Sequence, residues 1–203
     1  MKKLLVLTML LLSSCMGVPK NVKVIDGINA EQYLGTWYEI ARLDHSFERG
    51  LDNVTAHYEK REDGGIKVTN RGYNRADKEW NNAIGKAYFL EQPATDNTYL
   101  GKLKVSFFGP FYGAYNIIAL DKEYYNYVMI CGPDKEYLWI LSRTPELTYP
   151  IKQHLVSQAN QYGFATENLI YVNQNPDIPN YEAGQHVVNP KSVNPKGTKK
   201  PKQ

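Results

Sequence analysis

The chain has 203 residues and a formal net charge of +3, and its composition is 42% hydrophobic and 12% aromatic, with 16 tyrosines. This length fits one all-β domain with short appendages, and the aromatic share favours strands. The positive charge is too small and too dispersed to indicate a nucleic-acid-binding surface, and no motif of an RNA- or DNA-reading module is present.

Residues 1–14 have the pattern of a lipoprotein signal peptide. Two lysines follow Met1, and the apolar run over residues 4–12 is too short to span a bilayer. The run ends in Leu-Ser-Ser-Cys15, which matches the lipobox, where small residues precede the cleaved bond and the cysteine thiol takes the diacylglycerol. An ordinary signal peptide with an incidental cysteine is the alternative. We expect lipidation at Cys15 and a tether over residues 15–29. Met16 stands where an inner-membrane retention signal would have Asp, so the expected location is the outer membrane.

The stretch over residues 33–42 predicts a tight turn followed by a strand. Gly35 permits a positive φ, and aromatic and β-branched residues follow it. Trp37, directly after the turn, is placed to plug one end of a closed sheet. Arg143 ends a late apolar run, and its guanidinium can stack on an indole face. We therefore predict a structural contact between Trp37 and Arg143.

Strand patterns recur along the chain with turn residues between them, as in a hairpin-linked antiparallel barrel. Turn signals lie at 63–65, 93–97 and 132–134. Eight strands make a barrel just wide enough for one small ligand. We expect strands at residues 37–42, 54–60, 66–73, 83–90, 100–107, 114–120, 125–131 and 137–142.

One helix is expected after the barrel, because Leu147, Ile151, Leu155 and Ala159 recur on one helical face. Its start lies between Thr144 and Tyr149, since Pro150 is tolerated only in the first turn, and Gly163 ends it. Residues 169–172 predict a short closing strand.

Residues 177–203 contain four prolines and five lysines and little to bury, so we expect a disordered basic tail. Such a tail serves either as a solubilising segment or as a contact for anionic lipid headgroups.

Gly35-x-Trp37 paired with Arg143 resembles the signature of the lipocalins, and the resemblance is closest to the bacterial lipocalins, which are small outer-membrane lipoproteins. Residues 47–51, 104–113 and 131–134 extend the resemblance, which reaches about Asn175. It implies an all-β, eight-stranded, up-and-down antiparallel barrel over residues 30–176, with the C-terminal helix packed outside. It also implies that residues 45–53 form the loop over the open end of the barrel. A plain surface connection is the alternative for that loop.

The sequence offers no catalytic or metal-binding constellation. The four histidines are scattered without metal-ligand spacing, and no Gly-x-Ser-x-Gly elbow is present. Cys131 is the only cysteine of the folded body, so an internal disulfide is excluded and a buried structural thiol is expected. We expect no cofactor, no metal and no enzymatic activity.

What remains is a cavity, whose candidate lining comes from three strands. Alternation places Ala119 on the same side as Tyr115 and Ile117, but parity alone does not decide which side faces inward, because a bulge would invert it. Glu39 shares the side of Trp37, and an unpaired buried carboxylate is costly, so either the strand bends or Glu39 has a partner. The candidate ligand-binding residues are Phe107, Tyr115, Ile117, Trp139 and Leu141.

Two functions are compatible with these patterns. In the first, the barrel holds a fatty acid or a lysophospholipid, for storage or transport of lipids in the bacterial envelope. The domain is anchored to the outer membrane through Cys15 and faces the periplasm. In the second, the barrel is filled by its own side chains and serves as an envelope interaction module. Homodimer formation remains open in both.

Overall fold

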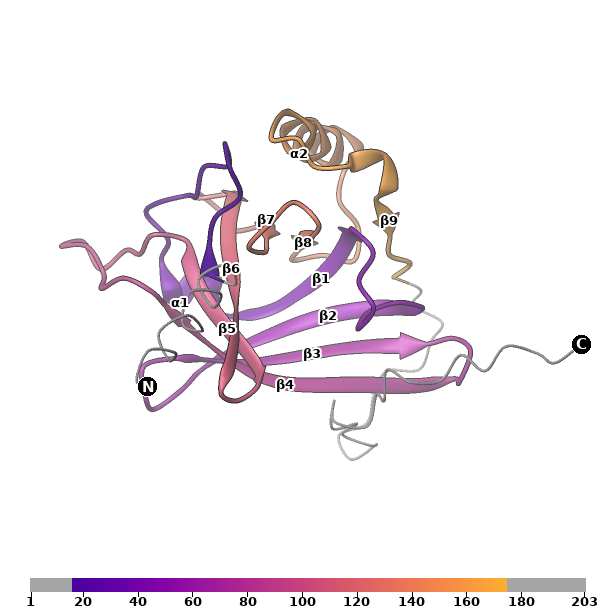
Figure 1. Ribbon diagram of the computed structural model, residues 1–203, viewed down its shortest axis with the longest axis horizontal. Helices are drawn as coiled ribbons and strands as arrows, with labels where there is room; N and C mark the ends of the chain where they lie inside the picture. The colour runs from indigo at the N-terminus through magenta and orange to yellow at the C-terminus, as the bar shows by residue number, and fades with distance from the viewer. Residues whose placement is uncertain (1–15, 175–203) are drawn as a thin grey trace, which may run out of the picture.

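The computed structural model describes residues 16–174 (Figure 1). Nine strands, two helices and a 3₁₀ turn follow one another along the chain. No helix within residues 16–174 is long and apolar enough to cross a membrane. The elements are α1 (Ala30–Tyr33), β1 (Gly35–Arg42), β2 (Leu51–Lys60), β3 (Ile66–Asn74), β4 (Glu79–Phe89), β5 (Lys102–Phe108), β6 (Phe111–Leu120), β7 (Tyr127–Cys131), β8 (Leu138–Ser142), α2 (Tyr149–Gln161), η2 (Thr166–Asn168) and β9 (Ile170–Tyr171).

The sheet closes into a barrel. Each strand from β2 to β7 pairs antiparallel with the next, and β1 completes the circle because it pairs with both β2 and β8. The short strand β9 adds to β1 from outside this circle. The predicted eight-stranded up-and-down barrel, the single C-terminal helix and the closing strand are therefore confirmed.

The connections alternate between the two ends of the barrel, as they must in an up-and-down sheet. One end carries α1 and the connections at residues 61–65, 90–101 and 121–126, and we call it the closed end. The other carries the connections at 43–50, 75–78, 109–110 and 132–137, and we call it the mouth end. Residues 43–50 are named the mouth loop below.

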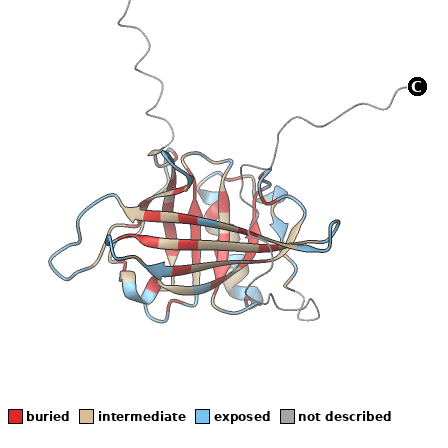
Figure 2. Ribbon diagram, turned by 90° about the horizontal axis from the view of Figure 1, so that it is seen from below, coloured by how far each residue is buried: buried red, intermediate tan, exposed pale blue. Residues whose placement is uncertain are grey.

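Two hydrophobic cores lie on opposite faces of the strands. The inner core lies inside the barrel and includes Trp37, Ile117 and Leu141. The outer core lies between the barrel wall and α2, and it contains Ile140 and Leu155. In Figure 1 the helix covers the side of the barrel formed by β7 and β8, and in Figure 2 buried residues form bands along the strands.

The helix begins and ends where its sequence predicts. Tyr149 is its first residue and Pro150 lies within its first turn, where a missing N–H costs little. Leu155 and Ala159 are fully buried against the barrel. Gly163 has a φ of 82°, which stops the helix.

Two β-bulges set which side chains face inward. In β1 the register shifts between Glu39 and Ala41, so Ile40 and Ala41 both join the outer core and Arg42 returns to the side of Glu39. In β6 the register shifts after Ile117. The predicted grouping of Ala119 with Tyr115 and Ile117 is therefore wrong, because the bulge sends Ala119 into the outer core.

Candidate functional site

The closed end is plugged by Trp37 beneath Arg143. The guanidinium carbon of Arg143 lies 3.8 Å from the centre of the Trp37 ring, whose side chain is fully buried. Arg143 also donates to the backbone oxygens of Thr36 at 3.0 Å and Gln32 at 2.6 Å. Gly35 has a φ of 94°, and a Cβ there would lie 3.3 Å from Arg143 Nη1. The predicted contact is present, and it ties the turn before β1 to the end of β8.

Three tyrosines form a polar layer above this plug. The Tyr115 hydroxyl lies 2.6 Å from the Tyr33 hydroxyl and 2.9 Å from that of Tyr58. Burial raises the pKa of all three phenols, that of Tyr58 to about 12. The layer therefore stays neutral and offers shared hydroxyl hydrogen bonds inside the barrel.

The structure brings all five candidate ligand-binding residues together in the inner core. Ile117 and Leu141 are buried, with 0% and 4% of their surface exposed. Phe107, Tyr115 and Trp139 are only partly buried, although they pack on the same core. Their common position in the interior is a fact of the structure, and their contact with a ligand stays a prediction.

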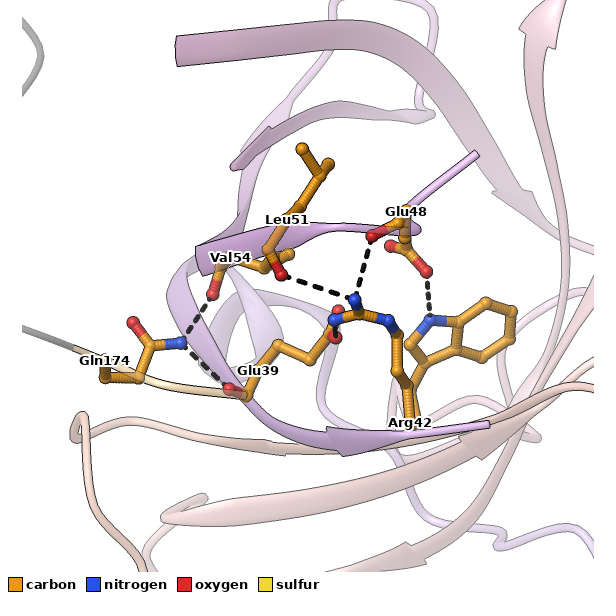
Figure 3. A network of polar contacts seen from close by, with 7 residues as sticks. Glu39, Arg42, Glu48, Leu51, Val54 and Gln174 are labelled. Atoms are coloured by element: carbon orange, nitrogen blue, oxygen red, sulfur yellow. Dashed lines mark hydrogen bonds and ion pairs between the residues drawn. The ribbon is translucent and has the colours of Figure 1, made fainter. Parts of the chain in front are cut away.

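A buried polar network lies between this wall and the mouth loop (Figure 3). Arg42 Nη1 donates to Glu39 at 2.6 Å, and the two side chains are 1% and 4% exposed. Arg42 Nη2 donates to the backbone oxygens of Glu48 at 2.8 Å and Leu51 at 3.3 Å. Trp139 Nε1 donates to Glu48 Oε2 at 2.9 Å. One arginine and one indole thus hold the mouth loop onto the barrel.

This network places two buried carboxyl groups beside one arginine. Burial and, to a smaller extent, the neighbouring Glu48 raise the pKa of Glu39 to about 8, although Arg42 opposes both. Burial also raises the pKa of Glu48, against the hydrogen bond from Trp139. The pair consequently retains a proton near neutral pH, which lowers the cost of burying it.

The mouth loop packs against the barrel wall through His45 and is therefore more than a plain surface connection. His45 is 4% exposed and stacks on Tyr137 at 4.9 Å and on Phe47 at 5.2 Å between ring centroids. Its ring centroid also lies 4.7 Å from that of Trp139. Burial, with a further contribution from Arg42, lowers the pKa of His45 to about 4, so the imidazole is neutral near pH 7. This favours the interpretation of residues 45–53 as a mouth covering.

The segment after α2 closes the seam between β1 and β2. Their pairing ends at Tyr38 and Thr55. Beyond that point Gln174 Nε2 donates to the backbone oxygens of Glu39 at 2.8 Å and Val54 at 2.9 Å (Figure 3). Gln174, the last residue that the structure describes, therefore holds β1 and β2 together beside the network.

Sequence reasoning missed Arg42, Glu48, Tyr33 and Tyr58 as parts of the interior. One signal was available, since a buried Glu39 required a partner, and Arg42 is that partner. Cys15 lies outside the described residues. Cys131 is fully buried as expected, and burial raises the pKa of its thiol to about 12. Within the described part of the chain no cluster of three or more His, Cys, Asp or Glu could hold a metal ion.

Comparison with known proteins gives consistent matches. Residues 28–174 match the model of the lipocalin-like domain. The chain is 55% identical over 156 residues to the outer membrane lipoprotein Blc of Citrobacter freundii, covering 77% of this chain and 85% of that protein. It is 52% identical over 170 residues to the outer membrane lipoprotein Blc of Vibrio cholerae, covering 84% and 96%.

Among solved structures, insecticyanin from the tobacco hornworm Manduca sexta has the same fold. The TM-score is 0.61 at 22% sequence identity, over 79% of this chain and 88% of the insecticyanin chain. At this identity the similarity concerns the fold alone.

Proposed function

We propose that this protein, which belongs to the lipocalin family, binds a single-chain lipid, either a fatty acid or a lysophospholipid, inside its barrel. Lipocalins are binding proteins, and this chain is a binding protein for hydrophobic ligands rather than an enzyme. The identity of the lipid is the part that we propose.

The observation that carries the proposal is the partial exposure of aromatic side chains that face the interior. Phe107, Tyr115 and Trp139 pack on the inner core and yet retain accessible surface. An acyl chain laid against them would leave water, which contributes about 0.8 kcal/mol per buried methylene before the cost of ordering the chain. One chain is favoured over two, because an eight-stranded barrel has little interior to spare.

The buried network supports a headgroup that stays near the mouth. The two terminal nitrogens of Arg42 already donate to Glu39, to the backbone of the mouth loop at Glu48 and to Leu51 at the start of β2. A ligand carboxylate or phosphate at this depth would compete with Glu39 and Glu48 for the same guanidinium. The acyl chain is therefore the part that enters, and the headgroup remains near the mouth loop.

The proposed location is the outer membrane, with the domain held by acyl chains on Cys15 and facing the periplasm. The lipobox ending at Cys15 supports the anchor, and two relatives at 52–55% identity are named outer membrane lipoproteins. The proposed domain organisation is a signal peptide over 1–14, a lipidated tether over 15–29, the lipocalin domain over 30–176 and a basic tail over 177–203.

A second function has one observation in its favour. Tyr33, Ile117 and Val128 are 0–1% exposed, so much of the interior is filled by the protein itself. A barrel filled throughout would act as an interaction module.

Mass spectrometry of lipids that copurify with residues 16–203 distinguishes the two functions. The proposed function predicts one single-chain lipid per protein, released by organic extraction. If the protein is lipid-free and also fails to take up added fatty acid or lysophospholipid, the interaction module would remain as its function.

A further inference from the structure

Exposed phenylalanines lie on two connections of the mouth end. Phe47 in the mouth loop is 63% exposed, and Phe108 and Phe111, which flank the 109–110 turn, are 44% and 74% exposed. Strands β1 and β5 lie on opposite sides of an eight-stranded circle, so these side chains stand on opposite sides of the mouth. Exposed large apolar side chains grouped at one end indicate an interaction surface.

The path of the chain before the barrel points toward the same end. Asn116, which is 1% exposed, donates from Nδ2 to the backbone oxygens of Gly17 at 3.0 Å and Gly132 at 3.1 Å. Gly132 follows β7 and opens the 132–137 connection of the mouth end. Tyr137 in that connection stacks on His45, which stacks on Phe47. A continuous set of contacts thus joins Gly17 to the mouth loop.

The distance between Gly17 and a lipid anchor is short. Cys15 precedes Gly17 by two residues, which span at most about 7 Å of extended chain. Acyl chains on Cys15 would therefore enter a bilayer close to the 132–137 connection. An anchor attached so near one end of a rigid barrel restricts which end can meet the membrane.

We propose that the mouth end docks on the lipid surface that holds the anchor, with Phe47, Phe108 and Phe111 entering the interfacial layer. The inference rests on the proposed lipidation of Cys15 and deepens the proposed function, because a ligand would then pass between bilayer and barrel without crossing water. Phenylalanine side chains at the interface add apolar burial to the anchor. The closed end, with Trp37 and Arg143, points away from the membrane.

Spin labels at two similarly exposed aromatic positions test this orientation. Phe111→Cys places a label at the mouth end, and Tyr124→Cys places one at the closed end, where Tyr124 is 69% exposed. Cys131 is fully buried and does not compete for the label. The lipidated full-length chain is reconstituted in vesicles of phosphatidylethanolamine and phosphatidylglycerol. Accessibility is then measured to oxygen, which enters the bilayer, and to a nickel chelate, which stays in water.

Docking predicts that the label at 111 is reached by oxygen and protected from nickel, and that the label at 124 shows the reverse. Equal nickel access at both positions would overturn the proposal. So would spin–spin broadening at position 111 in the anchor-free protein, because a second copy of the chain would then cover these phenylalanines.

A transfer experiment separates this inference from the proposed function. The double variant Phe108→Ser, Phe111→Ser changes only exposed side chains that lie outside the mouth loop. Below the critical micelle concentration it should bind a lysophospholipid as tightly as the unmodified protein does. From vesicles it should take up the same lipid several-fold more slowly than the unmodified protein. An unchanged uptake rate would contradict docking. If the unmodified protein binds no lysophospholipid at all, the proposed ligand is wrong, while the labelling result still decides the orientation.

Discussion

Trp139 Nε1 donates to Glu48 Oε2 at 2.9 Å, so a residue of the barrel wall holds the loop above it. The two residues are 91 positions apart in the chain and meet only because β8 pairs with β1. The Trp139 ring also lies beside His45 of the same loop. A ligand that contacts Trp139 would therefore act on the mouth loop as well as on the wall.

Trp139→Phe keeps an aromatic ring in the wall but removes this donor, which leaves a buried carboxyl group without its partner. We expect a loss of about 1–3 kcal/mol in the free energy of unfolding. Faster amide exchange in the mouth loop, with no change in β3, would localise the effect. In a double-mutant cycle with Glu48→Met, which removes the acceptor, the two changes together should cost less than the sum of their separate costs. Strict additivity would contradict the coupling.

Trp37→Ala should cost about 3–5 kcal/mol, because it removes a fully buried aromatic side chain from the closed end. Arg143→Lys should destabilise to a smaller extent, since lysine cannot stack on the indole and donate to Thr36 and Gln32 at the same time. Urea denaturation measures both, with Tyr124→Ala as the exposed control. Wild-type midpoints for both variants would rule out a structural role for the contact.

Glu39 should make stability depend on pH in the direction opposite to that of most carboxylates. Its folded-state pKa is raised from 4.5 to about 8, so the folded protein holds a proton that the unfolded chain releases. The stabilising contribution is fully present below about pH 4.5 and is lost as the pH rises through about 8.

Glu39→Gln cannot ionise but still offers an oxygen to Arg42. Its free energy of unfolding should fall less than that of the wild type between about pH 5 and pH 9, where Glu39 titrates. Glu59→Gln is the control, because Glu59 lies on the surface and Lys67 lowers its pKa. Parallel pH profiles for wild type and Glu39→Gln would show that Glu39 does not hold this proton.

The sequence was sufficient to predict the barrel, the helix and the contact between Trp37 and Arg143. These features depend on local patterns and on residue types that have few alternatives. Alternation correctly placed Trp139 and Leu141 on one side of their strand, since β8 is regular. It misplaced Ala119 because a bulge adds one residue without leaving a mark in the pattern. The sequence indicated that a buried Glu39 needs a partner but did not identify it, since the bulge in β1 puts Arg42 beside Glu39 and a long-range contact brings in Glu48.

Cys15→Ala should abolish acylation and leave the precursor uncleaved by the lipoprotein peptidase. The reason is chemical, because alanine has no thiol to take the diacylglycerol. Metabolic labelling with a radioactive fatty acid, followed by membrane fractionation, measures the outcome. Cys131→Ala is the matched control and should label normally, since that thiol is fully buried. Acyl labelling of the Cys15→Ala protein would exclude the lipobox interpretation.

Ala56→Phe tests the depth to which an acyl chain reaches. Ala56 lies across from Trp37 in the sheet and packs on the inner core, so a larger side chain there takes space near the closed end. In the Ala56→Phe variant, the affinity for acyl ligands should stop rising at a shorter chain length than in the wild type. Ile84→Phe is the control, because Ile84 is 49% exposed and lies outside the inner core. An equal effect of both changes would contradict a chain that extends to the closed end.

The most direct test of a lipid-binding barrel is a calorimetric and fluorescence titration of residues 16–203 with lysophospholipids of increasing chain length. Our account predicts one-to-one binding, an affinity that rises with each added methylene until the barrel is full, and a change in tryptophan emission that Trp139→Phe reduces. Titrations that show no heat and no change in emission at any chain length would contradict it.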